Sequence, residues 1–182
     1  MKNIQSFRMG ECLSLLEVEI VAALRARGLT VSAAESCTGG LIAKKITDVP
    51  GSSAVIEGSL VSYSNRIKCL LAGVSPETIA AHTEVSQETA LEMARGVRKL
   101  FSSAIGLATT GYAGPGGGTD EHPLGTVFVA VSSEDFEKVE ELHIEQASRE
   151  AVREAAANRA LTLALSALKQ YDLNQKIERI LP

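Results

Sequence analysis

Apolar residues recur at helical spacing in two long stretches of the chain. Within residues 10–27 an apolar side chain returns every three or four positions from Leu13 onward, and Gly28 follows as a stop signal. Residues 148–170 repeat this spacing over a greater length. The pattern predicts an amphipathic helix in each stretch, and we expect the tail at residues 172–182 to add no more than a loose turn.

Further helices are indicated by capping residues. Ser75 precedes Pro76, which is the favoured order of an N-cap and a first helical position, and Ser86 precedes another periodic stretch. We expect the helix after Ser86 to bury a stripe made of Ala90, Met93, Val97 and the pair Leu100/Phe101. Short helices are also expected over residues 41–47 and 65–71.

Five segments have the composition and length of strands. They cover residues 30–35, 55–63, 104–110, 125–132 and 138–145. The first strands alternate with helices, which favours parallel pairing, whereas the last two flank a short turn and are expected to form a hairpin. We therefore expect a three-layer α/β/α fold with a mixed, partly parallel sheet. One domain is expected over residues 1–182, with a core at about residues 11–170.

Composition and charge narrow the class of protein. The 182 residues are 45% hydrophobic and 22% charged, with a net charge of −4 and no basic run, so we expect no nucleic-acid partner. Cys12, Cys37 and Cys69 match no zinc spacing and are expected to be reduced thiols in a cytoplasmic protein. No signal-peptide pattern or membrane-length apolar run is visible, so no membrane association is expected.

A small polar cluster follows the first predicted strand. It contains Ser36, Cys37, Thr38, Gly39 and Gly40, directly before a predicted helix. Free backbone N–H groups at such a junction stabilise negative charge, so the serine is a candidate nucleophile and its neighbours are candidate ligand contacts. The thiol of Cys37 is a rival nucleophile. The alternative is a helix cap with glycines that allow close packing.

Tyr63 and Lys68 lie at the end of the second predicted strand and in the short helix after it. If that helix begins after Ser64, the lysine is about one turn inside it. A lysine with a depressed pKa can accept the proton of a serine, and a tyrosine hydroxyl can share that proton transfer. The alternative is an ordinary solvated lysine on a helix surface.

A glycine-rich loop follows the strand at residues 104–110. It provides Thr110, Gly111, Gly114, Gly116 and Gly117 as candidate contacts to a ligand. Glycines are costly in backbone entropy, and close approach of backbone N–H groups to a ligand is a frequent reason for them. The loop lacks the lysine of a phosphate-binding Walker loop, and a strand follows it rather than the helix of a dinucleotide site. The alternative is a flexible connection.

Arg149 and Arg153 are four positions apart on the last predicted helix. They share one helix face and could clamp an anionic group such as a phosphate. The alternative is pairing with the nearby residues Glu145, Glu150 and Glu154.

Two further features concern metals and partners. His82, His122 and His143 are scattered without a carboxylate or cysteine at ligand spacing, so we expect no metal and no cofactor. The apolar stripe of the last helix and the pair Leu70-Leu71 leave room for a homodimer or a higher homo-oligomer. The sequence does not say whether a neighbouring subunit would complete the site.

Together these segments resemble the family of the C-terminal domain of competence/damage-inducible protein A (CinA), the nicotinamide-nucleotide amidases. The similarity rests on residues 34–40, 50–53, 63–65 with Lys68, 71–74, 111–119 and 125–127. The resemblance implies a three-layer α/β domain that hydrolyses nicotinamide mononucleotide to nicotinic acid mononucleotide and ammonia. It also implies that Ser36 is the nucleophile, Lys68 its base and Tyr63 an assisting hydroxyl, while the glycine loop and Arg149 and Arg153 hold the ribose phosphate.

Two alternatives to this assignment remain open at this point. The family usually carries Gly-Asp-Arg before the last helix, where this chain has Ala147-Ser148-Arg149, and this departure motivates a non-catalytic nucleotide-binding or competence-related regulatory module. The second alternative keeps the enzyme but moves the nucleophile to Cys37.

Overall fold

The computed structural model describes residues 15–145 and 147–180. Its elements are α1 (Leu15–Arg27), β1 (Val31–Glu35), α2 (Leu41–Thr47), the 3-10 turn η1 (Ser52–Ala54), β2 (Ile56–Val61), α3 (Asn65–Leu71), α4 (Pro76–His82), α5 (Gln87–Phe101), β3 (Ile105–Gly111), β4 (Thr126–Ser132), β5 (Glu137–His143) and α6 (Arg149–Ile180). Every helix and strand expected from the sequence is present in the described chain. The predicted start at residues 10–14 lies outside the described residues.

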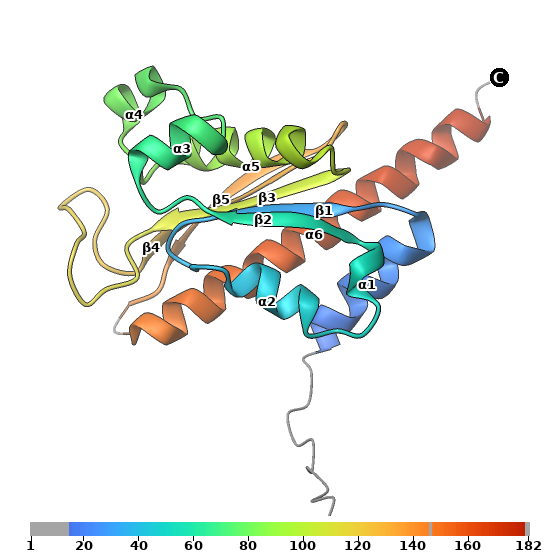
Figure 1. Cartoon of the computed structure of the whole chain (residues 1–182), viewed down its shortest axis with the longest axis horizontal. Helices are drawn as coiled ribbons and strands as arrows, with labels where there is room; N and C mark the ends of the chain where they lie inside the picture. Colours follow the sequence, from blue (N-terminus) through green and yellow to red (C-terminus); the bar gives the residue numbers. More distant parts are fainter. Residues whose placement is uncertain (1–14, 146, 181–182) are drawn as a thin grey trace, which may run out of the picture.

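The five strands form one mixed sheet in the order β2-β1-β3-β4-β5 (Figure 1). β1 pairs in parallel with β2 and β3, and its last residue, Glu35, lies opposite Val61 on one side and Thr109 on the other. β4 and β5 are added as an antiparallel hairpin. The carboxyl ends of β1, β2 and β3 therefore meet at one edge of the sheet, and the mixed sheet predicted from the sequence is confirmed.

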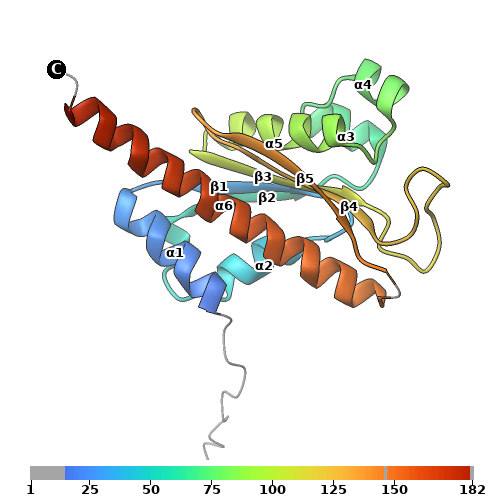
Figure 2. The same ribbon diagram turned by 180° about the vertical axis from the view of Figure 1, so that it is seen from behind.

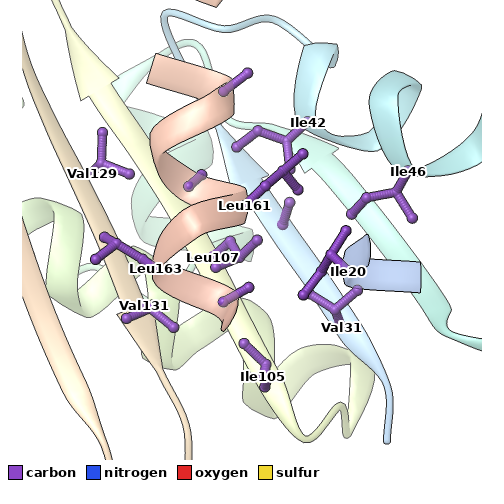
Figure 3. Close-up of a cluster of buried hydrophobic side chains, with 14 of the residues drawn as sticks. Ile20, Val31, Ile42, Ile46, Ile105, Leu107, Val129, Val131, Leu161 and Leu163 are labelled. Atoms are coloured by element: carbon purple, nitrogen blue, oxygen red, sulfur yellow. The ribbon is translucent and has the colours of Figure 1, made fainter. Parts of the chain in front are cut away.

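Helices cover both faces of the sheet, which gives the three-layer α/β/α fold predicted from the sequence. α1, α2 and α6 pack on one face, and α3, α4 and α5 on the other (Figures 1 and 2). The larger core cluster lies under α6, where Leu161 and Leu163 pack among Leu107, Val129 and other buried aliphatic side chains (Figure 3). Full burial of such a side chain stabilises the fold by about 1.5–3 kcal/mol.

The smaller core cluster lies between α5 and the opposite face of the sheet. Met93 and Val97 of α5 are fully buried there with Ala108 of β3 and Ala130 of β4. The predicted buried stripe of α5 is thus confirmed except at its end, because the side chain of Leu100 is 50% exposed. Phe101 is the residue of the predicted pair Leu100/Phe101 that packs against this cluster.

The helix starts expected from capping residues are confirmed. The side chains of Ser64, Ser75 and Ser86 each accept a hydrogen bond from a backbone N–H three residues later. Such caps satisfy N–H groups that lack a partner inside the helix.

The end of α6 is where the sequence prediction was wrong. The helix continues to residue 180 instead of ending near Gln170, and its last part extends past the end of the sheet (Figure 2). Arg27 of α1 holds this extension through two hydrogen bonds to Asp172, of 2.9 and 2.6 Å. Within the described ranges, no helix is both long and apolar enough to cross a membrane.

Candidate active site

The carboxyl edge of the parallel strands gathers the polar residues singled out by the sequence. Ser36 follows β1 and its amide donates to the carbonyl oxygen of Thr109 at 3.0 Å. Ser62 follows β2 and its amide donates to the carbonyl oxygen of Glu35 at 2.8 Å. These two bonds continue the strand pairing one residue past β1 and β2, so the chain after each strand is fixed next to its neighbour. This is the edge at which open α/β sheets bind ligands.

Ser36 and Lys68 form a buried pair at this edge. The Nζ atom of Lys68 is 3.0 Å from the Oγ atom of Ser36 and 3.0 Å from the carbonyl oxygen of Ser62. Only 1% of Lys68 and 8% of Ser36 are exposed. Lys68 is therefore not the solvated surface lysine that was the alternative interpretation of the sequence.

The environment of Lys68 disfavours its charged form. Loss of hydration on burial lowers the pKa of the amine, and the nearby charge of Glu84 offsets part of that effect. Both nearest polar partners, a hydroxyl and a carbonyl group, are uncharged. A neutral amine next to a hydroxyl group can act as its proton acceptor.

Cys37 has the opposite character. It is 5% exposed, and loss of hydration raises the pKa of its thiol to about 11. A helix N-terminus can activate a thiol, but for Cys37 the effect of burial is the larger one. Since the thiolate is the nucleophilic form, the geometry favours Ser36 as the nucleophile.

Glu35 occupies the start of α2. Its carboxylate accepts hydrogen bonds from the amides of Gly40 (2.9 Å), Ile42 (3.0 Å) and Ala43 (3.0 Å). A carboxylate at this position satisfies unpaired amides and interacts favourably with the helix dipole. The amide of Gly40 thus already binds a carboxylate of the protein, and a contact of this glycine with a ligand stays a prediction. Sequence reasoning missed this role of Glu35.

A small cavity opens above the serine–lysine pair. Its volume is about 150 Å³, and the predicted site residues that line it are Ser36, Tyr63, Lys68, Thr110, Gly111 and Arg149. Thr38, Gly39, Gly40, Gly114, Gly116, Gly117 and Arg153 are not in this lining. A larger cavity of about 500 Å³ lies at the opposite end of the sheet, beside the end of α6, and is lined by none of the predicted site residues.

Arg149 connects the two sides of the cavity mouth. Its guanidinium donates to the carbonyl oxygen of Gly114 at 2.6 Å and to the hydroxyl oxygen of Tyr63 at 3.2 Å. Tyr63 is 64% exposed and lines the cavity, and its hydroxyl is hydrogen-bonded to Arg149 and not to Lys68. No direct contact between Tyr63 and Lys68 supports the proton-sharing role expected for this tyrosine. Arg149 is exposed at the entrance and can bind an anion.

Arg153 is held in a different way. Its guanidinium donates twice to the carbonyl oxygen of Thr38, at 3.0 and 2.6 Å. A Cβ atom on Gly39 would lie 3.1 Å from the same guanidinium, so this glycine makes room for the arginine. Both arginines line a further cavity of about 360 Å³, so their common clamp on an anion stays a prediction. Arg153 also supports the turn after Ser36.

The remaining predicted contacts lie in or near the glycine loop. Thr110 uses its hydroxyl to donate to the carbonyl oxygen of Glu84 at 2.6 Å. Gly116 and Gly117 are exposed on the loop. Sequence reasoning missed the lining residues Glu84 and Val85, since nothing in their local pattern distinguishes them from a connection between helices.

Comparison with known proteins agrees with this architecture. The model of the family described as "CinA C-terminal domain" matches residues 14–168. A CinA-like protein of Amoebophilus asiaticus is 40% identical over 95% of the chain, and one of Syntrophus aciditrophicus is 44% identical over 86%. The chain spans only 39% and 36% of the length of these two relatives.

Two solved structures have the same fold. The competence/damage inducible protein CihA of Agrobacterium tumefaciens is 38% identical with a TM-score of 0.83, over 91% of this chain and 99% of that one. A CinA superfamily protein of Klebsiella pneumoniae is 31% identical with a TM-score of 0.82, over 88% of this chain and 99% of that one. On the family match and these identities, the chain belongs to the CinA C-terminal domain family.

Proposed function

We propose that this chain is an amidohydrolase that converts nicotinamide mononucleotide to nicotinic acid mononucleotide and ammonia. The observation that carries the proposal is the 3.0 Å contact between the Ser36 hydroxyl and the Nζ atom of Lys68, both of them buried. The substrate follows from the family resemblance, whereas the names of the relatives state only that they are CinA-like or competence-damage inducible.

The acylation step follows from this pair. The neutral amine of Lys68 accepts the Oγ proton while Oγ of Ser36 bonds to the carboxamide carbon, giving a tetrahedral intermediate. The C–N bond then breaks, and the Lys68 ammonium returns its proton to the leaving nitrogen, which departs as ammonia. The positive charge of the substrate's pyridinium ring makes the carboxamide carbon more electrophilic, so the attack needs no metal ion.

Deacylation reverses the roles. Water bonds to the acyl carbon and gives a proton to Lys68, and the ester bond to Ser36 then breaks as Lys68 returns that proton to Oγ. The net reaction adds one water and releases the acid and ammonia, and the serine and lysine end in their starting protonation states. General-base assistance of this kind contributes about 10²–10⁴-fold to a rate.

The developing oxyanion needs backbone donors near Ser36. The amide of Tyr112 donates to the carbonyl oxygen of Thr126 in β4. Successive amides of a strand point to opposite sides, so the amide of Gly111 is directed to the side of β1, where Ser36 lies. Gly111 lines the cavity, and a Cβ atom on it would approach the backbone of β4 to within 2.5 Å. This glycine amide is our preferred oxyanion donor.

The size of the cavity suits one end of the substrate. A volume of about 150 Å³ corresponds to about five water molecules at ~30 Å³ each, which is room for a planar ring with its carboxamide. The ribose phosphate would then extend past the mouth, where Arg149 is exposed and offers a planar guanidinium to a phosphate group.

An ammonia-release assay tests the proposal. Wild-type protein is incubated with nicotinamide mononucleotide, plain nicotinamide and other nucleotides, and ammonia is measured in a coupled assay. We expect release from the mononucleotide and much slower release from nicotinamide, which lacks both the phosphate and the ring charge. Thermal stabilisation by the mononucleotide without any product would instead support the non-catalytic binding module.

A further inference from the structure

Glu84 is the one residue with a carboxylate among the described residues that line the cavity of Ser36 and Lys68. It lies with Val85 in the connection between α4 and α5 and is only partly buried. Loss of hydration is the main influence on two pKa values in this cavity, lowering that of the Lys68 amine and raising that of the Tyr112 hydroxyl, and the negative charge of Glu84 has a smaller upward effect on both. Glu84 therefore shares this cavity with Lys68 and Tyr112.

The backbone around Glu84 is held firmly. Its carbonyl oxygen accepts the 2.6 Å bond from Thr110 of β3. The preceding residue, Thr83, has φ 66° and ψ 175°, a conformation used almost only by glycine. The carbonyl oxygen of Thr83 accepts a 2.7 Å bond from the hydroxyl of Thr89, and the side chain of Val85 is 3% exposed. A strained residue persists only when its surroundings fix it, so the backbone at Glu84 is held in place.

The carboxylate of Glu84 has no hydrogen bond or salt bridge to any residue that the structure describes. The charged groups around the cavity are Lys68 on α3 and Arg149 on α6, and neither is within salt-bridge distance of it. A carboxylate that lines a cavity without a protein partner leaves its acceptor oxygens open for a bound ligand to complete. The ligand that would do so carries positive charge or N–H donors.

We propose that Glu84 is the specificity-determining residue of this site and selects a cationic carboxamide over its carboxylate product. The inference rests on the proposed function. Any carboxamide within reach of Ser36 lies in the same small cavity as Glu84, where its N–H groups and the pyridinium charge meet a carboxylate that can only accept hydrogen bonds. Hydrolysis replaces those N–H donors with a second carboxylate, so repulsion favours release of the product.

Binding measurements without turnover test this inference. Isothermal titration compares Ser36→Ala, Ser36→Ala/Glu84→Gln and Ser36→Ala/Glu77→Gln, each with nicotinamide mononucleotide and nicotinic acid mononucleotide. Glu77 is an exposed acid on α4 outside the cavity and serves as the matched control. We expect the Glu84 variant to lower the preference for the amide at least tenfold, or about 1.4 kcal/mol, and the Glu77 variant to leave it unchanged.

The outcomes separate the inference from the proposed function. An amide-to-acid preference of the Glu84→Gln protein within threefold of its Ser36→Ala parent overturns the inference, as does failure of the parent to bind either nucleotide. If Glu84→Gln does not fold, the Ser36→Ala parent is titrated with the reduced, uncharged form of the mononucleotide, and equal affinity for both ring forms overturns it. A wild-type protein that releases no ammonia but shows the Glu84-dependent preference contradicts the proposed function alone.

Discussion

Lys68 and Ser36 are 32 positions apart, and the Nζ atom of the first is 3.0 Å from the Oγ atom of the second. β1 and β2 are parallel neighbours, so the residues after their carboxyl ends meet at the same edge of the sheet. The Ser64 cap starts α3 at this edge, and the first turn of the helix brings Lys68 beneath the serine. The contact is thus a consequence of parallel pairing and one capped helix.

Replacing Lys68 with methionine separates catalysis from stability. We expect Lys68→Met to lower kcat by about 10²–10⁴-fold, because Ser36 loses its proton acceptor. The fold should be as stable as the wild type or more so, since a buried amine with a lowered pKa is a cost that methionine removes. Ammonia release and thermal melting measure the two effects.

The difference in stability between Lys68→Met and the wild type should change with pH in a predictable direction. The folded pKa of Lys68 lies below its unfolded value of about 10.4, so its destabilising effect is complete below the folded pKa and disappears as the pH rises to the unfolded value. The free energy of unfolding of Lys68→Met should therefore exceed that of the wild type by less at high pH than at neutral pH. Lys99→Met, on the exposed side of α5, is the control. A stability difference between Lys68→Met and the wild type that increases with pH contradicts the lowered pKa of Lys68.

Glu35 should matter for stability because its carboxylate satisfies three amides at the start of α2. Glu35→Gln keeps the shape but replaces one acceptor oxygen with a donor that faces a backbone N–H group. We expect a loss of about 1–3 kcal/mol in the free energy of unfolding, the cost of a buried polar group without a partner. Urea denaturation measures it, with the exposed Glu57→Gln on β2 as control, and equal losses in both variants would refute the role.

Glu140 of β5 pairs with Arg159 of α6, and this contact lowers the pKa of the carboxyl to about 2. Its stabilising effect is complete above the unfolded pKa of about 4.3 and is lost as the pH falls toward the folded value. Glu140→Gln should cost about 0.2–1 kcal/mol at neutral pH, as expected for a partly exposed ion pair. Melting curves from pH 7 to pH 2 should show that the stability difference between the wild type and Glu140→Gln decreases as the pH falls. A difference that stays constant, or that Glu145→Gln shows equally, argues against the pair.

The fold could be predicted from the sequence because local patterns agree with the tertiary structure over most of the chain. Capping serines and strand-forming segments gave the elements, and their order indicated a mixed sheet. The end of α6 could not be predicted, because the apolar stripe of the helix fades after Leu168, where the sheet no longer covers it. The continuation depends on helix-favouring residues and on the contact from Arg27 to Asp172.

The candidate site could be predicted only in part, because some of its contacts depend on the tertiary structure. Ser36, Lys68 and the glycine loop carry recognisable residue types, so they could be proposed from spacing and resemblance. The roles of Glu35, Glu84 and Arg153 depend on which backbone groups the fold brings to them, and no local pattern contains that information. Helix spacing placed Arg149 and Arg153 on one face, but it could not show that Arg153 would donate two hydrogen bonds to the carbonyl oxygen of Thr38.

The central claim is that the Ser36 hydroxyl is the nucleophile. Its most direct test is the steady-state rate of ammonia release from nicotinamide mononucleotide by Ser36→Ala, beside Ser59→Ala as the matched control on β2. The account predicts that Ser36→Ala is folded but at least about a thousandfold slower than wild type, while the control keeps its activity. A Ser36→Ala rate within tenfold of the wild-type rate would contradict it.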